Sequence, residues 1–242
     1  MARYRTANEI INRAAIEVGL ATDSDPVSST VDTYTQLTGL LNSAGDELVE
    51  MNAWPVLVST YAITTQTGDD GTYSLPDDFA YMINQTGWNT SGLYPLVGPL
   101  SAQQWTAIVG QDLGSNPIWA SFRLFDDSFQ LLPDPPAVGL DISFEYISNA
   151  WLLDASNNRR STIGAGSDIV LFSPIMTIKM LKMKWLDMKG FDSSAARLEF
   201  DGLFNARIGK ETGAPVLSAG GIIGYPYLNP MTNVPFSGFG GV

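Results

Sequence analysis

The spacing of apolar residues changes twice along this chain, and that change limits the folds open to it. A helix with one buried face repeats apolar residues every three or four positions, whereas a half-covered strand alternates them. Helical spacing covers the first 55 residues and returns after about residue 156, with β-branched and alternating stretches between. The pattern predicts two helical segments separated by a β segment.

The N-terminal part is predicted to form a helical hairpin. Thr6 and Glu9 have the spacing of a capping box, and apolar residues follow at helical intervals up to Val18. A second helix is expected from about Thr30 to Met51. It should end before Pro55, because the residue that precedes a proline is driven out of the helical conformation.

The middle of the chain is predicted to form a small antiparallel β domain. The sequence VLVSTYAITT at 56–65 is rich in β-branched residues, and a hairpin is expected over 121–133 around Asp126-Asp127. Further short strands are expected at 72–75, 81–88, 91–97 and 142–147, with a short helix capped by Ser101 among them.

Two helices are expected again at the C-terminal side, from about Ser167 to Gly190 and from Ser193 to Lys210. Pro174 fits an early helical position better than the middle of a helix, so the alternative is a separate short turn at Ile169–Phe172 before it. The inward face of the first should hold Ile175, Ile178, Leu181, Trp185 and Met188. We therefore predict an α+β fold with a four-helix bundle made of an N-terminal and a C-terminal helical hairpin. The predicted parts are the bundle (1–55 and 156–211), the antiparallel β insert (56–155) and an extended C-terminal tail (212–242).

The chain contains no cysteine and no histidine. That composition excludes thiolate nucleophiles, disulfides, zinc fingers, Ser-His-Asp triads and histidine-based metal sites, so any enzyme would have to use carboxylates, Lys, Tyr or Ser. We expect no metal, no cofactor and no enzyme activity. No apolar run approaches the ~18 residues of a membrane helix, and the first residues lack the apolar stretch of a secretory signal. Neither a membrane anchor nor secretion is therefore expected.

The negative charge is concentrated in the middle of the chain. The net charge is −12, and the segment between Val56 and Asn158 contains one basic residue, Arg123, and eleven acidic residues. Such a charge repels the phosphates of nucleic acids. We therefore expect no sequence-specific binding of DNA.

The last 31 residues, 212–242, carry no charge but contain seven glycines, four prolines and four aromatic residues. Glycine and proline disfavour helix and central strand, while disordered tails are usually polar and charged. We predict that this tail binds a neighbouring subunit or another protein. The residues expected to make the contact are Ile222, Ile223, Tyr225, Tyr227, Leu228, Phe236 and Phe239.

The paired acids of LPDDF are the most catalytic-looking feature of the sequence. Asp77 and Asp78 could serve glycoside hydrolysis, but adjacent side chains of an extended chain point to opposite faces. Pro76 followed by Asp is also ordinary turn chemistry, so Pro76, Asp77, Asp78 and Phe79 are interpreted as a structural corner. The six tryptophans are interpreted mainly as packing residues, with a sugar platform as the alternative.

Two other features could bind phosphate. Arg159-Arg160 is a small basic cluster, for which a solvated loop is the favoured interpretation. The IGAGSD sequence at 163–168 has glycines but lacks both the GK[ST] of a P-loop and the full GxGxxG spacing, so no nucleotide role is assigned.

Several features together resemble the head-to-tail adaptor proteins of short-tailed bacteriophages, the tail accessory factor and tail tubular protein A group. They are the order of elements, Trp54-Pro55 after the second helix, the YSLPDDF sequence followed by Trp88, and the apolar C-terminal extension. The resemblance covers about residues 4–210, and YxLPxDF followed by an aromatic residue is its most specific motif. The long uncharged tail departs from the pattern.

This resemblance implies a structural protein of the virion neck or tail, made in the host cytoplasm. It implies a ring of twelve copies that docks on the portal, extends the channel for passing DNA and contacts tail nozzle, tube or fibre proteins. The C-terminal extension would grip the portal. The alternative from a different class is a cell-wall glycosidase or a glycan-binding module that uses the acids and tryptophans of the β insert.

Overall fold

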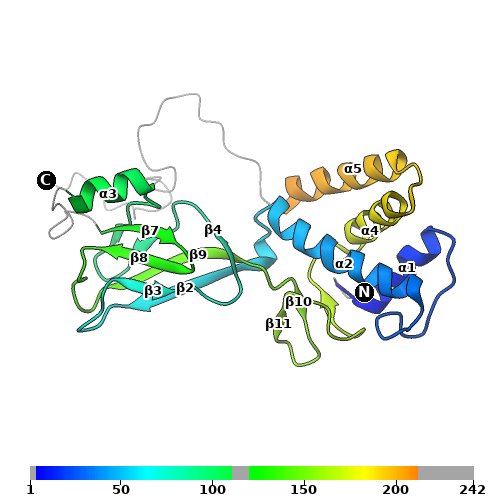
Figure 1. Cartoon of the computed structure of the whole chain (residues 1–242), viewed down its shortest axis with the longest axis horizontal. Coiled ribbons are helices and arrows are strands. Elements are labelled where there is room, and N and C mark those ends of the chain that lie inside the picture. Colours follow the sequence, from blue (N-terminus) through cyan, green and yellow to red (C-terminus); the bar gives the residue numbers. More distant parts are fainter. Residues whose placement is uncertain (1–3, 111–119, 212–242) are drawn as a thin grey trace, which may run out of the picture. The chain divides into compact units, whose positions relative to one another are not determined.

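The structure is a computed structural model, and it describes residues 4–110 and 120–211. The chain divides into two units, Met1–Thr212 and Gly213–Val242, and the elements below belong to the first (Figure 1). The helices are α1 (Ala7–Glu17), α2 (Asp32–Met51), α3 (Ala102–Gly110), α4 (Pro174–Lys189) and α5 (Ser194–Glu211), with a 3-10 helix at Pro55–Leu57. The strands are β1 (Arg5–Thr6), β2 (Val58–Thr64), β3 (Thr72–Ser74), β4 (Phe79–Met82), β5 (Trp88–Asn89), β6 (Tyr94–Pro95), β7 (Ser121–Phe125), β8 (Ser128–Leu132), β9 (Asp141–Ser148), β10 (Leu152–Leu153), β11 (Arg159–Arg160) and β12 (Ile169–Val170).

The predicted fold class, a four-helix bundle with a small β insert, is wrong. The described residues form a β-rich protein with three antiparallel sheets, and one of these sheets takes three of its four strands from the part predicted as helical bundle. Its strand order is β1-β12-β10-β11, and it pairs Arg5 with Val170 and Leu152 with Val170. Each of its strands is two residues long. Because two residues show no period, the sequence pattern contains no signal for this sheet.

The predicted helices pack around α4, which contacts α1, α2 and α5 (Figure 1). α4 buries seven of its side chains, whereas α1 and α2 touch each other less extensively. The helical core continues into the neighbouring strands, since Ile147, Leu152 and Val170 belong to the same buried cluster. The helices and the short sheet therefore share one core.

Two tryptophans fix the centre of this core. Trp54 donates its indole N–H to the Leu48 carbonyl at 2.5 Å, and its ring meets Phe172 edge-on with 5.8 Å between centroids. Trp151 lies against Gly45 of α2 so closely that a Cβ on Gly45 would come 2.1 Å from the indole Cε2. The packing of Trp151 therefore leaves no room for a side chain at position 45, which explains a glycine there even though glycine lowers helix propensity.

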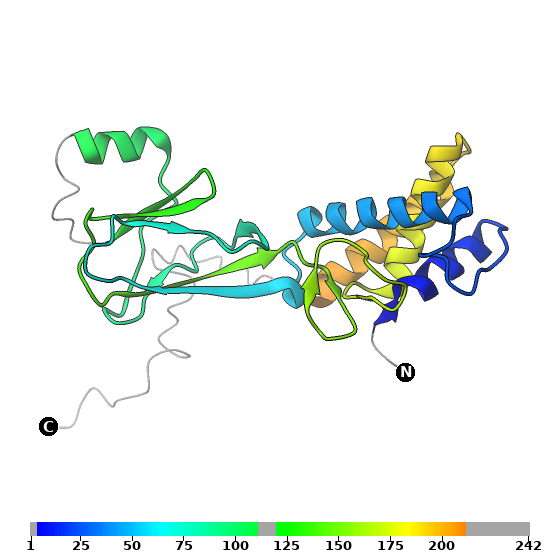
Figure 2. The ribbon, with the colours of Figure 1, turned by 60° about the horizontal axis from the view of Figure 1, so that its bottom comes forward.

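The second and third sheets form the predicted β region. Strand β9 is central: it pairs with β2 over seven residues on one edge, and with β4 and β5 on the other (Figure 2). The third sheet has the order β3-β8-β7. Between the two sheets Phe129 stacks on Phe122 at 5.1 Å and on Phe144 at 5.3 Å. These rings form a second core, separate from the helical one.

Two details of α4 differ from the sequence prediction. The helix begins at Pro174, the early helical position expected for this proline, and Ile169–Val170 before it pairs as strand β12 rather than forming a helical turn. Ile175 is 58% exposed and Met188 is 43% exposed, so these two residues do not belong to the inward face, where they were predicted to lie.

The predicted α1 cap is confirmed, since the Thr6 hydroxyl accepts from the Glu9 amide at 3.3 Å.

Candidate functional site

The LPDDF corner, Pro76–Phe79, lies between β3 and β4, where the chain passes from one sheet to the other. The Phe79 amide donates to the Pro76 carbonyl at 2.9 Å, which closes a turn. Asp77 is exposed and Asp78 is half-buried. The two adjacent carboxylates therefore differ in their exposure to solvent.

The carboxylate of Asp78 is engaged by β9. Its Oδ1 accepts from the Tyr146 hydroxyl at 2.8 Å, its Oδ2 accepts from Ser148 Oγ at 2.6 Å, and its carbonyl accepts from the Asn149 amide at 2.8 Å. Burial, followed by the bond to Asp78, raises the pKa of Tyr146 to about 12. These contacts favour a structural role for Pro76–Phe79, which stays a prediction.

The other acid doublets lie in turns. Asp69 accepts from the Gln66 amide at 2.7 Å and from the Tyr73 hydroxyl at 2.9 Å, and Asp70 accepts from the Thr72 amide at 2.9 Å. Burial and the bond to Asp69 raise the pKa of Tyr73. Asp126 has φ of 53° at the tip of the β7–β8 hairpin. The acids thus bond turn backbone, as short polar side chains commonly do.

The candidate phosphate sites are also occupied by the protein's own groups. The amides of Gly164 and Ala165 donate to Asp168 Oδ2 at 2.7 and 2.9 Å, so a buried carboxylate takes the donors that a phosphate would need. Arg159 donates to the Val56 carbonyl at 3.0 Å, and Arg160 packs beside Gly164. Both arginines line an open groove of about 390 Å³ together with Asp77 and Asp78, so the groove holds both signs of charge.

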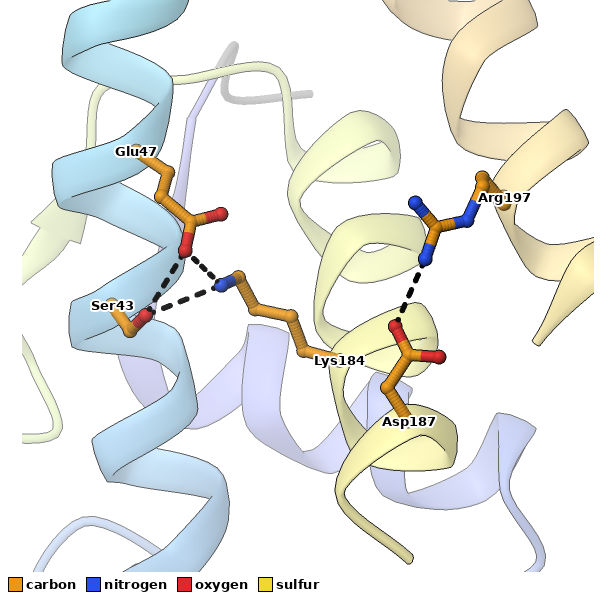
Figure 3. Close-up of polar contacts among 5 residues, drawn as sticks. All are labelled: Ser43, Glu47, Lys184, Asp187 and Arg197. Atoms are coloured by element: carbon orange, nitrogen blue, oxygen red, sulfur yellow. Dashed lines mark hydrogen bonds and ion pairs between the residues drawn. The ribbon is translucent and has the colours of Figure 1, made fainter. Parts of the chain in front are cut away.

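The lysines of α4 are engaged by neighbouring helices (Figure 3). Lys184 bonds Glu47 and Ser43 of α2, the latter at 3.2 Å, while Asp187 pairs with Arg197 of α5 at 3.3 Å. Lys189 donates to Gln36 of α2 at 2.8 Å. These bonds join α2, α4 and α5, and the charge of Lys184 is paired with a carboxylate within the subunit.

A second network joins α1, α4 and α5. Lys179 pairs with Glu17 at 2.8 Å and with Glu199 at 2.9 Å, and Lys182 lies within 4 Å of the same two carboxylates. The bonds to Glu17 and then Glu199 raise the pKa of Lys179, and the bond to Lys179 lowers the pKa of Glu199. The α4 lysines are therefore helix-joining groups rather than an open basic surface for DNA.

Exposed apolar side chains mark candidate assembly surfaces on the described residues. Ile16 of α1 and Ile175 of α4 line a groove of about 300 Å³ whose edge is the Glu17–Lys179 pair. Phe191, at the turn between α4 and α5, is 64% exposed. Large exposed apolar residues of this kind are typical of protein–protein contacts when they gather in patches.

Sequence reasoning missed a cluster of Trp105, Arg123 and Phe125. The Arg123 guanidinium carbon lies 4.2 Å from the Trp105 ring centroid and 4.7 Å from that of Phe125. One signal was available, because Arg123 is the single base between Val56 and Asn158.

The other tryptophans differ in burial. Trp54, Trp151 and Trp185 are buried, Trp88 is half-buried, and Trp119 lies outside the described residues.

The predicted binding residues of the tail, from Ile222 to Phe239, also lie outside the described residues, so their role stays a prediction.

Within residues 4–110 and 120–211, no group of acids is arranged to hold a metal ion. In the same part of the chain, none of the helices has both the length and the apolar character needed to cross a membrane.

The model of a family described as SU10 adaptor protein matches residues 5–221, which is most of the chain and includes both helical segments and all three sheets. No curated protein matches the chain at a significant level.

Proposed function

Because the chain belongs to the SU10 adaptor protein family, we propose that it forms a ring between the portal and the tail of a bacteriophage virion. Family membership confirms the resemblance to phage adaptors and identifies a structural component of the virion neck or tail. The finer proposal is a homo-oligomeric ring of about twelve copies. A head-to-tail contact between identical subunits produces such a ring when its rotation closes.

The observation that carries this proposal is the family match over residues 5–221. The helix-joining ion pairs add support, since a subunit that bears load in a particle needs a fixed internal core. The groove that Ile16 and Ile175 line together with charged residues, and the exposed Phe191, offer surfaces that a neighbouring subunit could cover. Permanent assemblies bury large apolar interfaces of this kind.

The proposed portal contact is the C-terminal tail, residues 212–242. An uncharged segment with Ile222, Ile223, Tyr225, Tyr227, Leu228, Phe236 and Phe239 gains free energy when another protein covers its apolar area. In this proposal the tail gives attachment, while the three sheets and the helices form the body of the subunit. The distal partners would be tail nozzle, tube or fibre proteins.

Deleting residues 213–242 tests the tail. We expect the truncated chain to keep its far-ultraviolet circular dichroism spectrum and unfolding midpoint but to lose binding to the portal in a co-sedimentation assay. Replacing the seven tail residues named above by serine at full length should also abolish portal binding, and because this variant keeps the tail's length it separates the loss of the apolar side chains from the loss of chain. Portal binding by either variant at the level of the parent would overturn the proposed docking role.

The ring and the channel have separate tests. Native mass spectrometry of the protein with portal should show a closed multiple of the 26.1 kDa chain, and a monomer bound alone would contradict the ring. The net charge of −12 and the internally paired lysines favour a channel wall or flank that repels DNA. Tight duplex binding at low salt would contradict that placement.

The hydrolase alternative receives no support from the geometry of the acids. Asp78 accepts hydrogen bonds from Tyr146 and Ser148, and the described residues that line the groove include no acid besides the adjacent Asp77 and Asp78. A retaining or inverting glycosidase needs two carboxyls that face each other across the scissile bond. Release of peptidoglycan fragments that is abolished by Asp77→Asn would reverse this conclusion.

A further inference from the structure

A cavity of about 340 Å³ lies in the β-rich part of the molecule, bounded by α3 and the sheet β3-β8-β7. Its polar lining includes Asp70, Arg123, Gln130 and Asp134, and Trp105 forms part of its apolar wall. Small-ligand sites have volumes of about 300–1000 Å³ and combine an apolar wall with a few placed polar groups. The cavity has this composition, and the adaptor function does not use it.

The polar groups of the cavity are held in place before any ligand arrives. The Arg123 guanidinium contacts the rings of Trp105 and Phe125, and its Nε donates to Gln130 Oε1 at 2.7 Å. Asp70 is fixed by the bond from the Thr72 amide. Binding to such groups loses little side-chain entropy, which is the main benefit of preorganisation.

The charge of the cavity narrows the class of ligand. An anion would meet Asp70 and Asp134 in a segment where a single base faces eleven acids, and a cation would meet the guanidinium of Arg123. The lining also offers donors from Arg123 and Gln130 beside carboxylate acceptors. A hydroxyl group both donates and accepts, so a neutral ligand with several hydroxyls can satisfy both kinds of group.

We propose that this cavity binds a neutral saccharide. The part of the Trp105 indole that Arg123 does not cover would contact the apolar C–H face of a sugar ring, while Arg123, Gln130, Asp70 and Asp134 would bond its hydroxyls. This function is distinct from ring assembly and from tail docking, and it needs neither. It is a binding function without bond breakage, so it does not revive the hydrolase alternative.

The test uses the full-length protein and defined sugars. Isothermal titration calorimetry with neutral oligosaccharides of glucose and of N-acetylglucosamine should reveal binding by at least one of them. Sialylated oligosaccharides of the same length serve as the anionic comparison, and we expect them to bind at least about tenfold more weakly. Absence of binding by every neutral sugar at millimolar concentration, or equal binding of the anionic ones, would overturn the proposal.

Variants connect the binding to this cavity. Trp105→Ala should weaken binding by about tenfold or more, and Trp105→Phe should weaken it less because an aromatic face remains. Since Trp105→Ala also removes the stack on Arg123, Val109→Arg provides a second variant: Val109 lines the cavity and is 53% exposed, so the larger side chain blocks the site without disturbing a core.

The matched control is Leu93→Arg, which adds the same charge at a side chain that is 83% exposed and does not line the cavity. It should bind the sugar as the parent does. Unchanged affinity in both Trp105→Ala and Val109→Arg would show that the sugar binds elsewhere and would contradict the assignment.

Discussion

Helices α3 and α4 are held in place by opposite means. At the start of α3 a complete capping box forms, because the Gln104 amide donates to Ser101 Oγ at 3.3 Å and the Ser101 amide donates to Gln104 Oε1 at 2.9 Å. Yet α3 buries none of its side chains. At the start of α4 the residue Ser173 makes no capping bond with its side chain, but the helix buries seven residues.

This difference separates local from tertiary stabilisation. A cap satisfies orphan backbone groups and is worth about 0.5–2 kcal/mol, whereas most helical stability in proteins comes from packing of an apolar face. We therefore expect α4 to open only with the whole subunit and α3 to open by itself. The four predictions below test this contrast, beginning with the largest expected effect.

The largest effect should come from removing a core side chain of α4. Leu181 is fully buried, and Leu181→Ala should lower the free energy of unfolding by about 2–5 kcal/mol through lost burial and a residual cavity. The matched change on α3 is Val109→Ala, which should cost less than about 0.5 kcal/mol because Val109 is exposed. Urea denaturation measures both, and similar costs would refute the contrast.

The next effect concerns the glycine beneath Trp151. Gly45→Ala places a Cβ against the indole and should cost about 1–3 kcal/mol by overpacking, even though alanine is the better helix former. Gly39→Ala in the same helix is the control, because a Cβ added at position 39 would have no neighbouring atom within 4 Å. It should stabilise the protein by about 0.4–1 kcal/mol. Thermal unfolding of the pair gives opposite shifts if the close packing is correct.

A smaller and local effect should follow from Arg123→Ala. Loss of the guanidinium removes the cation–π contacts that hold Trp105, which are worth about 0.5–2 kcal/mol. Amide hydrogen exchange of residues 102–110 should become faster, while that of α4 should not change. Arg123→Lys retains the charge without the planar group and should give an intermediate rate. Equal acceleration in both helices would mean that α3 unfolds only with the rest of the subunit.

The smallest effect should be the pH dependence of the Lys179–Glu199 pair. Glu199 has a lowered pKa, so its contribution is present above its usual value of 4.5 and is lost as the pH falls through the folded value. Lys179 has a raised pKa, so its contribution is present below its usual 10.5 and is lost as the pH rises through the folded value.

Between these limits the pair joins α4 to α5, and 1 M salt should weaken it because both side chains reach the surface. Glu199→Gln should reduce the loss of unfolding free energy at acid pH, measured by urea denaturation at a series of pH values. If the variant loses as much stability at acid pH as the parent, the effect belongs to other carboxylates.

Much of the local structure follows from short sequence signals. Thr6 caps α1 as predicted, Asp126-Asp127 forms the turn of the β7–β8 hairpin, and Pro55 marks the end of α2. These features depend on neighbours within a few positions, so spacing and turn chemistry suffice to find them. The family resemblance was likewise visible from the order of elements and the YSLPDDF motif, and the match over residues 5–221 confirms it.

The errors arose where contacts join distant residues. The sheet of β1, β10, β11 and β12 is made of two-residue strands, and the exposure of Ile175 could not be inferred from a helical pattern that places it inward. The cluster of Trp105, Arg123 and Phe125 brings together residues from a helix and a strand. The spacing of these three residues along the sequence does not indicate that their side chains meet.

The sequence by itself determined the positions of the helices and main strands, the absence of cysteine and histidine chemistry, and the uncharged character of residues 212–242. Each of these is a property of composition or of neighbours along the chain. Only the tertiary structure decided that the fold is β-rich, that Asp78 bonds β9, and that the α4 lysines face carboxylates of other helices. The physical reason is that burial and pairing are set by residues that meet in space, and periodicity specifies which face is apolar but not what covers it.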